Sequence, residues 1–256
     1  MTMENPWKGF GLSDVGRVRS TNQDAWLIDD RLGLWVVADG MGGHAGGEVA
    51  SQLTVDSIHE YLSIHAASTS NNTFANWREI LQKAVEYANS TVRKHGKAKP
   101  ALKGMGTTVV FVFKPNSDEH QAYVVHVGDS RAYLLRDRRL SAMTKDHTLL
   151  EERIQVGLLP KTTSSNHPLG HVLTRAVGIE SIVEADVTNI QLQVKDEILL
   201  CSDGLIKMMK DEQILEVLEN PEWSTTQETC KFLIDEANRL GGKDNATVIL
   251  IRQHKE

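Results

Sequence analysis

The chain has 256 residues, of which 40% are hydrophobic and 24% are charged, and its formal net charge is −6. This composition is typical of a folded globular protein and excludes a mostly disordered chain. The acidic balance and the lack of a long basic run argue against nucleic acid as a partner.

No apolar stretch approaches the ~20 residues that span a bilayer, and residues 1–8 lack the apolar core of a signal peptide. We therefore expect a cytoplasmic protein without a membrane partner. We also expect a monomer. Neither Cys201 nor Cys230 belongs to a C-x-x-C pair, so both are predicted to be reduced thiols in the core.

The predicted elements follow one another without a linker or an internal repeat, which favours one domain over residues 1–256. Taken in chain order, apolar patterns predict strands at 26–28 and 34–38, helices at 46–63 and around 77–92, and strands at 107–113, 122–127 and 132–135. Strands at 184–192 and 197–201 come next, followed by a helix capped by Ser224 and Gln227 that ends at Gly241, and a strand at 246–251.

Two connecting segments carry information of their own. Residues 115–119 predict a hairpin between two strands, so that at least part of the sheet is antiparallel. Residues 157–170 show no periodicity, and a loop of that length in a compact domain is usually functional or mobile.

Four aspartates stand where apolar runs stop or start. Asp39, Asp129 and Asp203 each end such a run and precede a small residue, and Asp244 comes just before the last strand. Singly, each is an ordinary turn residue. In antiparallel sheets the end of one strand lies beside the start of its neighbour, so we expect the four carboxylates to meet at one sheet edge.

Such a cluster of carboxylates repels itself unless cations neutralise it. Oxygen ligands without Cys or His favour Mg²⁺ or Mn²⁺. Two such ions activate a water molecule and stabilise the charge of an in-line displacement at phosphorus. The pattern predicts a hydrolase of phosphate esters without a covalent intermediate, and the segment with Arg17 and Arg19 offers a cation for the substrate phosphate.

Two other classes of function compete with this interpretation. The loop from Gly40 to Ala45 matches the looser dinucleotide fingerprint G-x-G-x-x-A, and Glu60 lies where a ribose-binding acid is expected. The alternative use of these glycines is a tight turn that brings backbone close to a metal. A catalytically inactive module that captures phosphopeptides is the third hypothesis, but it predicts the loss of metal-ligand aspartates, and all four are present.

The chain resembles the PPM family of metal-dependent protein serine/threonine phosphatases, the PP2C type, in its compact bacterial form. The matching motifs occur in family order over nearly the whole chain. They are Arg19-x-x-Asn22-Gln23-Asp24, Ala38-Asp39-Gly40-Met41-Gly42-Gly43-His44, Gly106-Thr107-Thr108, Gly128-Asp129-Ser130-Arg131, Asp146-His147, Leu173-Thr174-Arg175-Ala176-x-Gly178, Ser202-Asp203-Gly204 and Asp244-Asn245-Ala246-Thr247.

The resemblance implies an α+β fold, a four-layer α-β-β-α sandwich with two central antiparallel sheets and a metal centre at one edge. It implies two Mn²⁺ or Mg²⁺ ions, with a possible third. The substrates would be phosphorylated serine and threonine in proteins, and the enzyme would oppose a bacterial Ser/Thr kinase. Residues 157–170 coincide with the family's variable flap.

The resemblance also implies a role for each matching residue. Asp39 would bridge both ions, Asp203 and Asp244 would complete the first site, and the Gly40 carbonyl would bind the second ion. Asp129 would share a weaker third position with Asp203. Arg19 would hold the substrate phosphate, and Asp24 would orient metal-bound water.

Two positions depart from the family pattern. Some relatives have a histidine, proposed as general acid, where this chain has Met41, and His44 cannot be assumed to replace it. Many relatives have glutamate where this chain has Gln23, so we expect weaker or less charged contacts at the second ion.

Overall fold

Two antiparallel sheets pack face to face in the computed structural model, which describes residues 5–42, 46–65, 74–115, 120–160, 162, 167–222 and 225–253. The five-stranded sheet has the order β1 (Trp7–Asp14), β11 (Ala246–Gln253), β10 (Glu197–Cys201), β7 (Arg131–Arg136) and β8 (Arg139–Ala142). The second sheet has the order β2 (Asp24–Asp29), β3 (Leu34–Met41), β5 (Val109–Phe113), β6 (Gln121–Val127) and β9 (Asp186–Gln191), with the short β4 (Gly106–Thr107) paired to β3.

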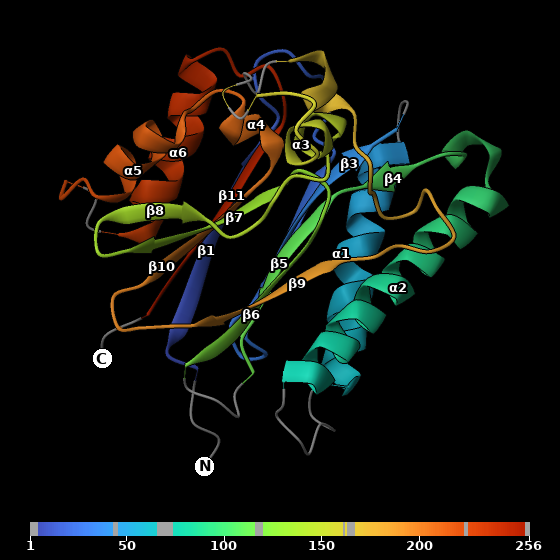
Figure 1. Ribbon diagram of the computed structural model, residues 1–256, viewed down its shortest axis with the longest axis horizontal. Coiled ribbons are helices and arrows are strands. Elements are labelled where there is room, and N and C mark those ends of the chain that lie inside the picture. The colour runs from blue at the N-terminus through green and yellow to red at the C-terminus, as the bar shows by residue number, and fades with distance from the viewer. Residues whose placement is uncertain are drawn as a thin grey trace.

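Helices cover the outer faces of both sheets (Figure 1). On the six-stranded sheet lie α1 (Gly46–His65) and α2 (Phe74–Ala98). On the other side lie α4 (Asp203–Ile206), α5 (Asp211–Leu218) and α6 (Thr226–Arg239), while α3 (Leu149–Gln155) lies near the end of the sandwich. Two 3₁₀ turns, η2 (Pro100–Leu102) and η3 (Pro168–His171), complete the described elements. None of the helices described is both long enough and apolar enough to cross a bilayer.

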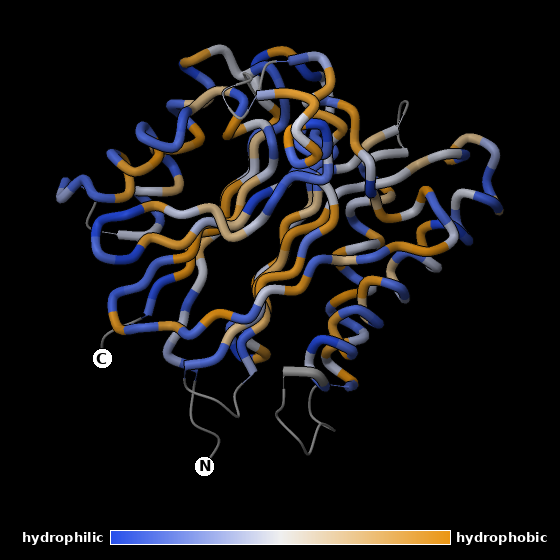
Figure 2. Tube along the Cα trace, in the orientation of Figure 1, coloured by the Kyte–Doolittle hydropathy of each residue, from blue (hydrophilic) through white to orange (hydrophobic). Residues whose placement is uncertain are grey.

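Successive side chains of a strand point to opposite faces of its sheet, so the hydrophobic core has three layers, one between the sheets and one under the helices on each side. Along β3, Trp35 and Val37 pack between the sheets, whereas Val36 and Ala38 face α1 and α2. A third cluster joins the outer face of the five-stranded sheet to α4, α5 and α6. Hydrophobic segments accordingly follow the central strands in Figure 2, with hydrophilic ones at the strand ends and on the outer surface.

Most predicted elements are confirmed within a few residues, and the pairing of β5 with β6 confirms the antiparallel hairpin, although residues 116–119 lie outside the described part. The predicted N-cap of the last helix was wrong by one residue. The Thr225 Oγ1 accepts from the Glu228 N–H at 3.1 Å, and Glu228 Oε2 accepts from the Thr225 N–H at 3.0 Å. This reciprocal pair begins α6, whereas the predicted cap Ser224 lies outside the described residues.

Cys201 and Cys230 are free and buried, as predicted. Burial raises the pKa of both thiols to about 12, so they are unreactive at neutral pH. The strand predicted at 107–113 is interrupted at Thr108, because Gly106–Thr107 pairs with the end of β3 as β4.

Candidate active site

A cavity of about 810 Å³ lies at the end of the sandwich where β3, β6 and β10 end and β11 begins. It brings together six of the seven residues that the sequence singled out, while Asp24 lies outside its lining. Those six are Arg19, Asp39, Gly40, Asp129, Asp203 and Asp244.

The four aspartates come from both sheets, so the expectation of a single sheet edge was only half right. Asp203 and Asp244 flank the neighbouring strands β10 and β11 of the five-stranded sheet. Asp39 on β3 and Asp129 after β6 belong to the other sheet. The cavity therefore lies across the end of the interface between the sheets, where each sheet contributes two carboxylates.

Asp24 lies behind Asp39, its register partner on β3. Its Oδ2 accepts hydrogen bonds from Ser202 Oγ at 2.8 Å, just after β10, and from Thr247 Oγ1 at 2.6 Å, on β11. Its Oδ1 is buried without a hydrogen-bond partner among the residues described. Two hydroxyl groups thus fix Oδ2, while Oδ1 remains available to a further partner. Burial raises the pKa of this carboxyl to about 7.

Two carboxylates of the cavity, Asp39 and Asp129, resist ionisation in the absence of cations. The pKa of Asp39 is raised well above its ordinary range, first by burial and then by the charges of Asp24 and Asp203. Burial and the charge of Asp203 also raise the pKa of Asp129, to about 7. The Oδ1 of Asp203 is buried without a partner in the part of the chain that is described. Raised pKa values and an unpartnered carboxylate oxygen both fit a site for divalent cations.

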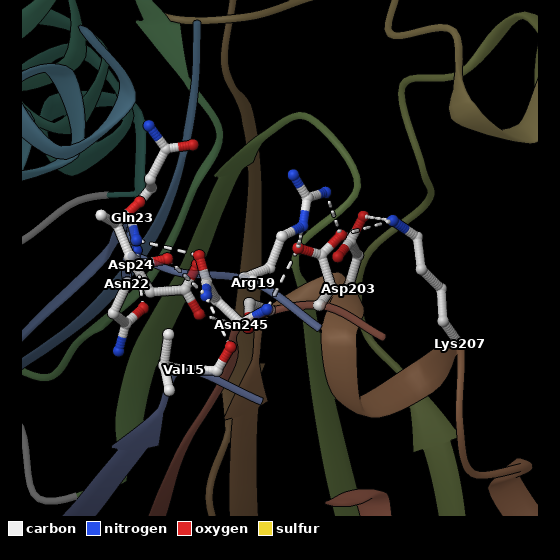
Figure 3. A network of polar contacts seen from close by, with 11 residues as sticks. Val15, Arg19, Asn22, Gln23, Asp24, Asp203, Lys207 and Asn245 are labelled. Atoms are coloured by element: carbon white, nitrogen blue, oxygen red, sulfur yellow. Dashed lines mark hydrogen bonds and ion pairs between the residues drawn. The ribbon is translucent and has the colours of Figure 1, made fainter. Parts of the chain in front are cut away.

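Two side-chain cations stand among these carboxylates (Figure 3). Arg19 Nε lies 2.8 Å from Asp244 Oδ1, and its Nη2 donates to Oδ2 at 3.0 Å. Lys207 pairs with Asp203, and its Nζ lies 3.5 Å from Asp244 Oδ2. Burial opposes the charge of Lys207, but the carboxylates of Asp203 and Asp244 raise its pKa above the ordinary value. Lys207 was not predicted from the sequence, although its position four residues after Asp203 on a helix was the available signal.

Asn245 ties the segment that carries Arg19 to the rest of the site (Figure 3). Its Nδ2 donates to the carbonyls of Val15 at 3.0 Å and Thr21 at 2.9 Å, and its Oδ1 accepts from the Gln23 N–H at 2.9 Å. The residue was part of a recognised motif, but this anchoring role was not predicted. It fixes the N-terminal loop beside β11, where Arg19 reaches the cavity.

Gly40 lies within β3 and not in a tight turn, which corrects the expected reason for the glycine. Its N–H donates to the Gln23 carbonyl at 3.1 Å. A Cβ on Gly40 would come within 2.1 Å of the Gly47 carbonyl oxygen in α1. Only a glycine lets the strand and the helix approach so closely. Met41 also lines the cavity, and His44 lies outside the described residues.

A second cluster of residues that could bind a metal has hydrogen bonds and an ion pair that account for its arrangement without a metal. One nitrogen each of His126 and His147 and one oxygen of Asp186 lie within 4.8 Å of one another. The His147 Nδ1 accepts from the Gly128 N–H at 3.2 Å, which places its proton on Nε2, on the side of Asp186. Arg175 Nη1 donates to Asp186 at 2.8 Å and supplies a positive charge. The cluster thus holds Arg175 in the cavity wall.

The metal-free protein offers a test of the raised pKa of Asp24. Between the ordinary value of 3.8 and about 7, the folded protein holds a proton that the unfolded chain has released, so this group makes folding less favourable as pH rises. The Asp24→Asn variant has an amide in place of this carboxyl and does not titrate at this position. In EDTA, its free energy of unfolding should rise relative to wild type between pH 5 and pH 7, by up to about 1.4 kcal/mol per pH unit.

Denaturant titrations of both proteins at several pH values measure this difference, and the contributions of groups that do not interact with Asp24, such as the exposed histidines, cancel in it. A constant difference across the pH range would show that Asp24 has an ordinary pKa in the folded protein.

A family model described as protein phosphatase 2C matches residues 16–240. The chain belongs to the protein phosphatase 2C family. The serine/threonine phosphatase stp of Listeria monocytogenes serotype 4b is 35% identical over 244 residues, which cover 94% of this chain and 94% of that protein. The crystal structure of the Mycobacterium tuberculosis serine/threonine phosphatase PstP/Ppp has a TM-score of 0.85 at 36% identity, covering 97% of this chain and 99% of that one. A structure of the PstP catalytic domain in complex with two manganese ions has a TM-score of 0.81 at 35% identity, with coverage of 97% and 99%.

These relatives confirm the family and the four-layer fold that the motifs implied. The dinucleotide-binding alternative was wrong, because β3 is followed by two helices and pairs with its neighbours in antiparallel fashion. Relatives named as phosphatases also favour an enzyme over an inactive phosphopeptide-binding module. This PP2C-family chain is a metal-dependent protein phosphatase.

Proposed function

We propose that this PP2C-family phosphatase hydrolyses phosphoserine and phosphothreonine in proteins with the carboxylate cluster at the end of the sandwich. The observation that carries the proposal is the cavity in which Asp39, Asp129, Asp203 and Asp244 converge with Arg19. Two bound Mn²⁺ or Mg²⁺ ions supply an activated water molecule and stabilise charge at phosphorus. The whole chain 1–256 is proposed to form this one domain, with residues 157–170 as a flap.

The proposed ligands follow from the position of each oxygen. Asp39, central among the carboxylates that raise its pKa, would be a ligand shared by both ions. Asp203, through its unpartnered Oδ1, and Asp244 complete the first site. The Gly40 carbonyl serves the second ion, and Asp129 with Asp203 faces a weaker third position.

The remaining residues act on substrate and water. The Arg19 side chain is 52% exposed and reaches the cavity, so its planar guanidinium is proposed to bind two phosphate oxygens. The free Oδ1 of Asp24 accepts a hydrogen bond from the attacking water and orients it. No described residue takes the role of general acid in this proposal, because the position that would supply it carries Met41.

The substrate class is tested by incubating the protein with Mn²⁺ and phosphothreonine, phosphoserine or phosphotyrosine peptides of one sequence. Orthophosphate release from the first two is expected. Release from none of the peptides, or from phosphotyrosine alone, would refute the proposed class.

We further propose that the protein is a monomer in the bacterial cytoplasm and reverses the action of a Ser/Thr kinase there.

The roles of Arg19 and Asp203 predict opposite effects of substitution. Arg19→Ala should raise KM for a phosphothreonine peptide about tenfold or more while Mn²⁺ binding persists, because a phosphate contact is lost. Asp203→Ala should abolish Mn²⁺ binding at the first site. Steady-state kinetics and calorimetric Mn²⁺ titration of the two variants measure these effects. If Arg19→Ala lost Mn²⁺ and Asp203→Ala kept it, the assignment would be reversed.

A further inference from the structure

A basic surface lies at the end of α2. Residues 87–117 contain no aspartate or glutamate, whereas the chain as a whole has a formal net charge of −6. Cations gather in the second half of α2 and just beyond it, at Arg93, Lys94, Lys97, Lys99 and Lys103. The helix dipole favours cations in the last turn of a helix only, so it does not account for the whole group. The positive charge is therefore a local feature, of the kind that attracts an anionic partner.

Two adjoining hollows open on this surface. The first, of about 490 Å³, is lined by residues 181–183 and by the cations Arg93, Lys94 and Lys97. The second, of about 440 Å³, includes Arg93, Lys97 and Lys103 in its lining. Because both are lined by Arg93 and Lys97, the hollows adjoin and together form one basic groove.

Negative charge is scarce in the basic groove. Glu86 is the one carboxylate among the described residues that line it, and its Oε1 already accepts a hydrogen bond from Gln82 Nε2 at 2.9 Å. Lys94, Lys97 and Lys103 form no ion pair with any described carboxylate. Within the part of the chain that is described, the groove thus offers ammonium groups that have no anionic partner.

Residues 178–183 separate the basic groove from the catalytic cavity. Ile179 lines the catalytic cavity and the second hollow, and Ile182 lines the catalytic cavity and the first. These two isoleucines are 42% and 82% exposed. A polypeptide that leaves the catalytic cavity across this segment therefore meets apolar side chains first and the cations of α2 next.

Hydrogen bonds from α2 hold this segment in place. The Asn89 Nδ2 donates to the Glu180 carbonyl at 3.0 Å, and the Asn89 Oδ1 accepts from the Gly178 N–H at 2.7 Å. One turn later, Arg93 Nη1 donates to the Ile179 carbonyl at 2.9 Å. Figure 1 shows the segment beside the second half of α2, before β9 begins. The helix that carries the cations is therefore fixed relative to the catalytic cavity.

A protein substrate can reach both the catalytic cavity and the groove. Its chain continues on both sides of the phosphorylated residue, so some of its residues lie outside the catalytic cavity whenever the phosphate is inside. Complementary charges across an interface favour one partner over another. A substrate segment with aspartate or glutamate complements the basic groove, whereas a basic segment is repelled by it.

We propose that the basic groove binds acidic residues that flank the phosphorylated serine or threonine of a substrate protein, with Lys94 and Lys97 as specificity-determining residues. This inference rests on the proposed function and deepens it, because it names the class of substrate. The contacts lie away from the reacting phosphate and are equal in the ground state and the transition state, so they lower KM and leave kcat unchanged. Because both lysines are exposed, salt weakens the contacts.

The test compares two phosphothreonine peptides that differ only in having glutamates or glutamines on both sides of the phosphorylated residue. Each exposed ion pair contributes up to about fivefold, so at low ionic strength wild type should show a kcat/KM about tenfold higher for the glutamate peptide, through KM. High salt should remove most of this preference. Equal kcat/KM values for the two peptides at low ionic strength would overturn the inference.

Substitutions show whether the groove causes the preference. In Lys94→Gln/Lys97→Gln the preference should disappear. Arg78→Gln/Lys83→Gln is the matched control, because it removes the same charge from exposed positions in the first half of α2, and it should keep the preference. The ratio between two peptides cancels any general loss of stability or activity in a variant. A preference that survives in Lys94→Gln/Lys97→Gln, or that disappears in the control as well, would show that the groove does not cause it.

A charge reversal sharpens the test. With a third peptide that has lysines in place of the glutamates, Lys94→Glu/Lys97→Glu should prefer the lysine peptide to the glutamate peptide, the reverse of wild type. The wild-type order in this variant would refute the inference.

An anionic membrane surface is the competing occupant of the groove. Wild type that sediments with phosphatidylserine vesicles, together with a Lys94→Gln/Lys97→Gln variant that loses this binding but keeps the peptide preference, would assign the groove to a membrane and overturn the inference.

Failure of this inference is distinct from failure of the proposed function. Equal hydrolysis of the glutamate and glutamine peptides would refute only the role of the groove. Release of phosphate from neither peptide would refute the proposed function, and the role of the groove with it.

Discussion

Asp39→Asn is expected to lower kcat for a phosphothreonine peptide by about 10³-fold or more. Asp39 is the carboxylate whose pKa is raised by burial and by all the other aspartates of the site, which marks it as the centre of the cluster. A neutral amide cannot balance two divalent ions, so both the activated water and the stabilisation of charge at phosphorus are weakened. Steady-state release of orthophosphate at saturating Mn²⁺ measures the effect.

A suitable control is Asp56→Asn on the exposed face of α1, where the carboxylate only accepts a hydrogen bond from Gln52. This variant should retain wild-type kcat. A fall of less than tenfold in Asp39→Asn would mean that Asp39 does not bridge the ions.

Gly204→Ala is expected to destabilise the fold by about 3 kcal/mol and to weaken Mn²⁺ binding at the same time. A Cβ at this position would come within 1.9 Å of the Asn245 carbonyl oxygen, a backbone atom that cannot rotate away. Relieving the overlap requires α4 and the start of β11 to separate, at the upper end of the usual cost of overpacking. Asp203 and Asp244 lie directly beside these two residues, so their oxygens move apart.

Gly157→Ala separates this overlap from the general cost of replacing a glycine. No heavy atom lies within 4 Å of a Cβ there, but the φ of +74° disfavours alanine by about 1 kcal/mol. Denaturant unfolding and Mn²⁺ calorimetry on both variants should show a larger loss of stability, and a loss of Mn²⁺ affinity, in Gly204→Ala alone. Equal losses of stability with unchanged Mn²⁺ affinity would contradict the close contact between α4 and β11.

Local patterns in the sequence predicted the strands that are apolar on both faces. β5, β6 and β10 lie between a helix layer and the opposite sheet, so most of their residues are apolar on both faces, with His126 the exception inside β6. β1 was missed because its pattern is broken by Gly9 and Gly11. The structure explains both glycines: the indoles of Trp35 and Trp26 lie where a Cβ would be. That packing depends on β2 and β3 of the opposite sheet and leaves no local signal in the sequence of β1.

The carboxylates of the site were predictable because each one ends or precedes an apolar run. Their arrangement in space was harder to predict, because two of the aspartates come from each sheet and their distances depend on how the sheets pack. Lys207 and Asn245 act through contacts with distant segments or with residues on the next helical turn. Such contacts follow from the assembled fold, whereas the aspartates stand out in the sequence itself.

Phosphate release should depend on divalent ions held by these aspartates. The most direct measurement adds Mn²⁺ stepwise to protein dialysed against EDTA, and records bound Mn²⁺ and orthophosphate release from a phosphothreonine peptide in the same samples. We predict no release before metal is added, and release that rises with occupancy until two ions are bound per chain. Release from the metal-free protein at the full rate would show that hydrolysis does not depend on divalent ions held by these aspartates.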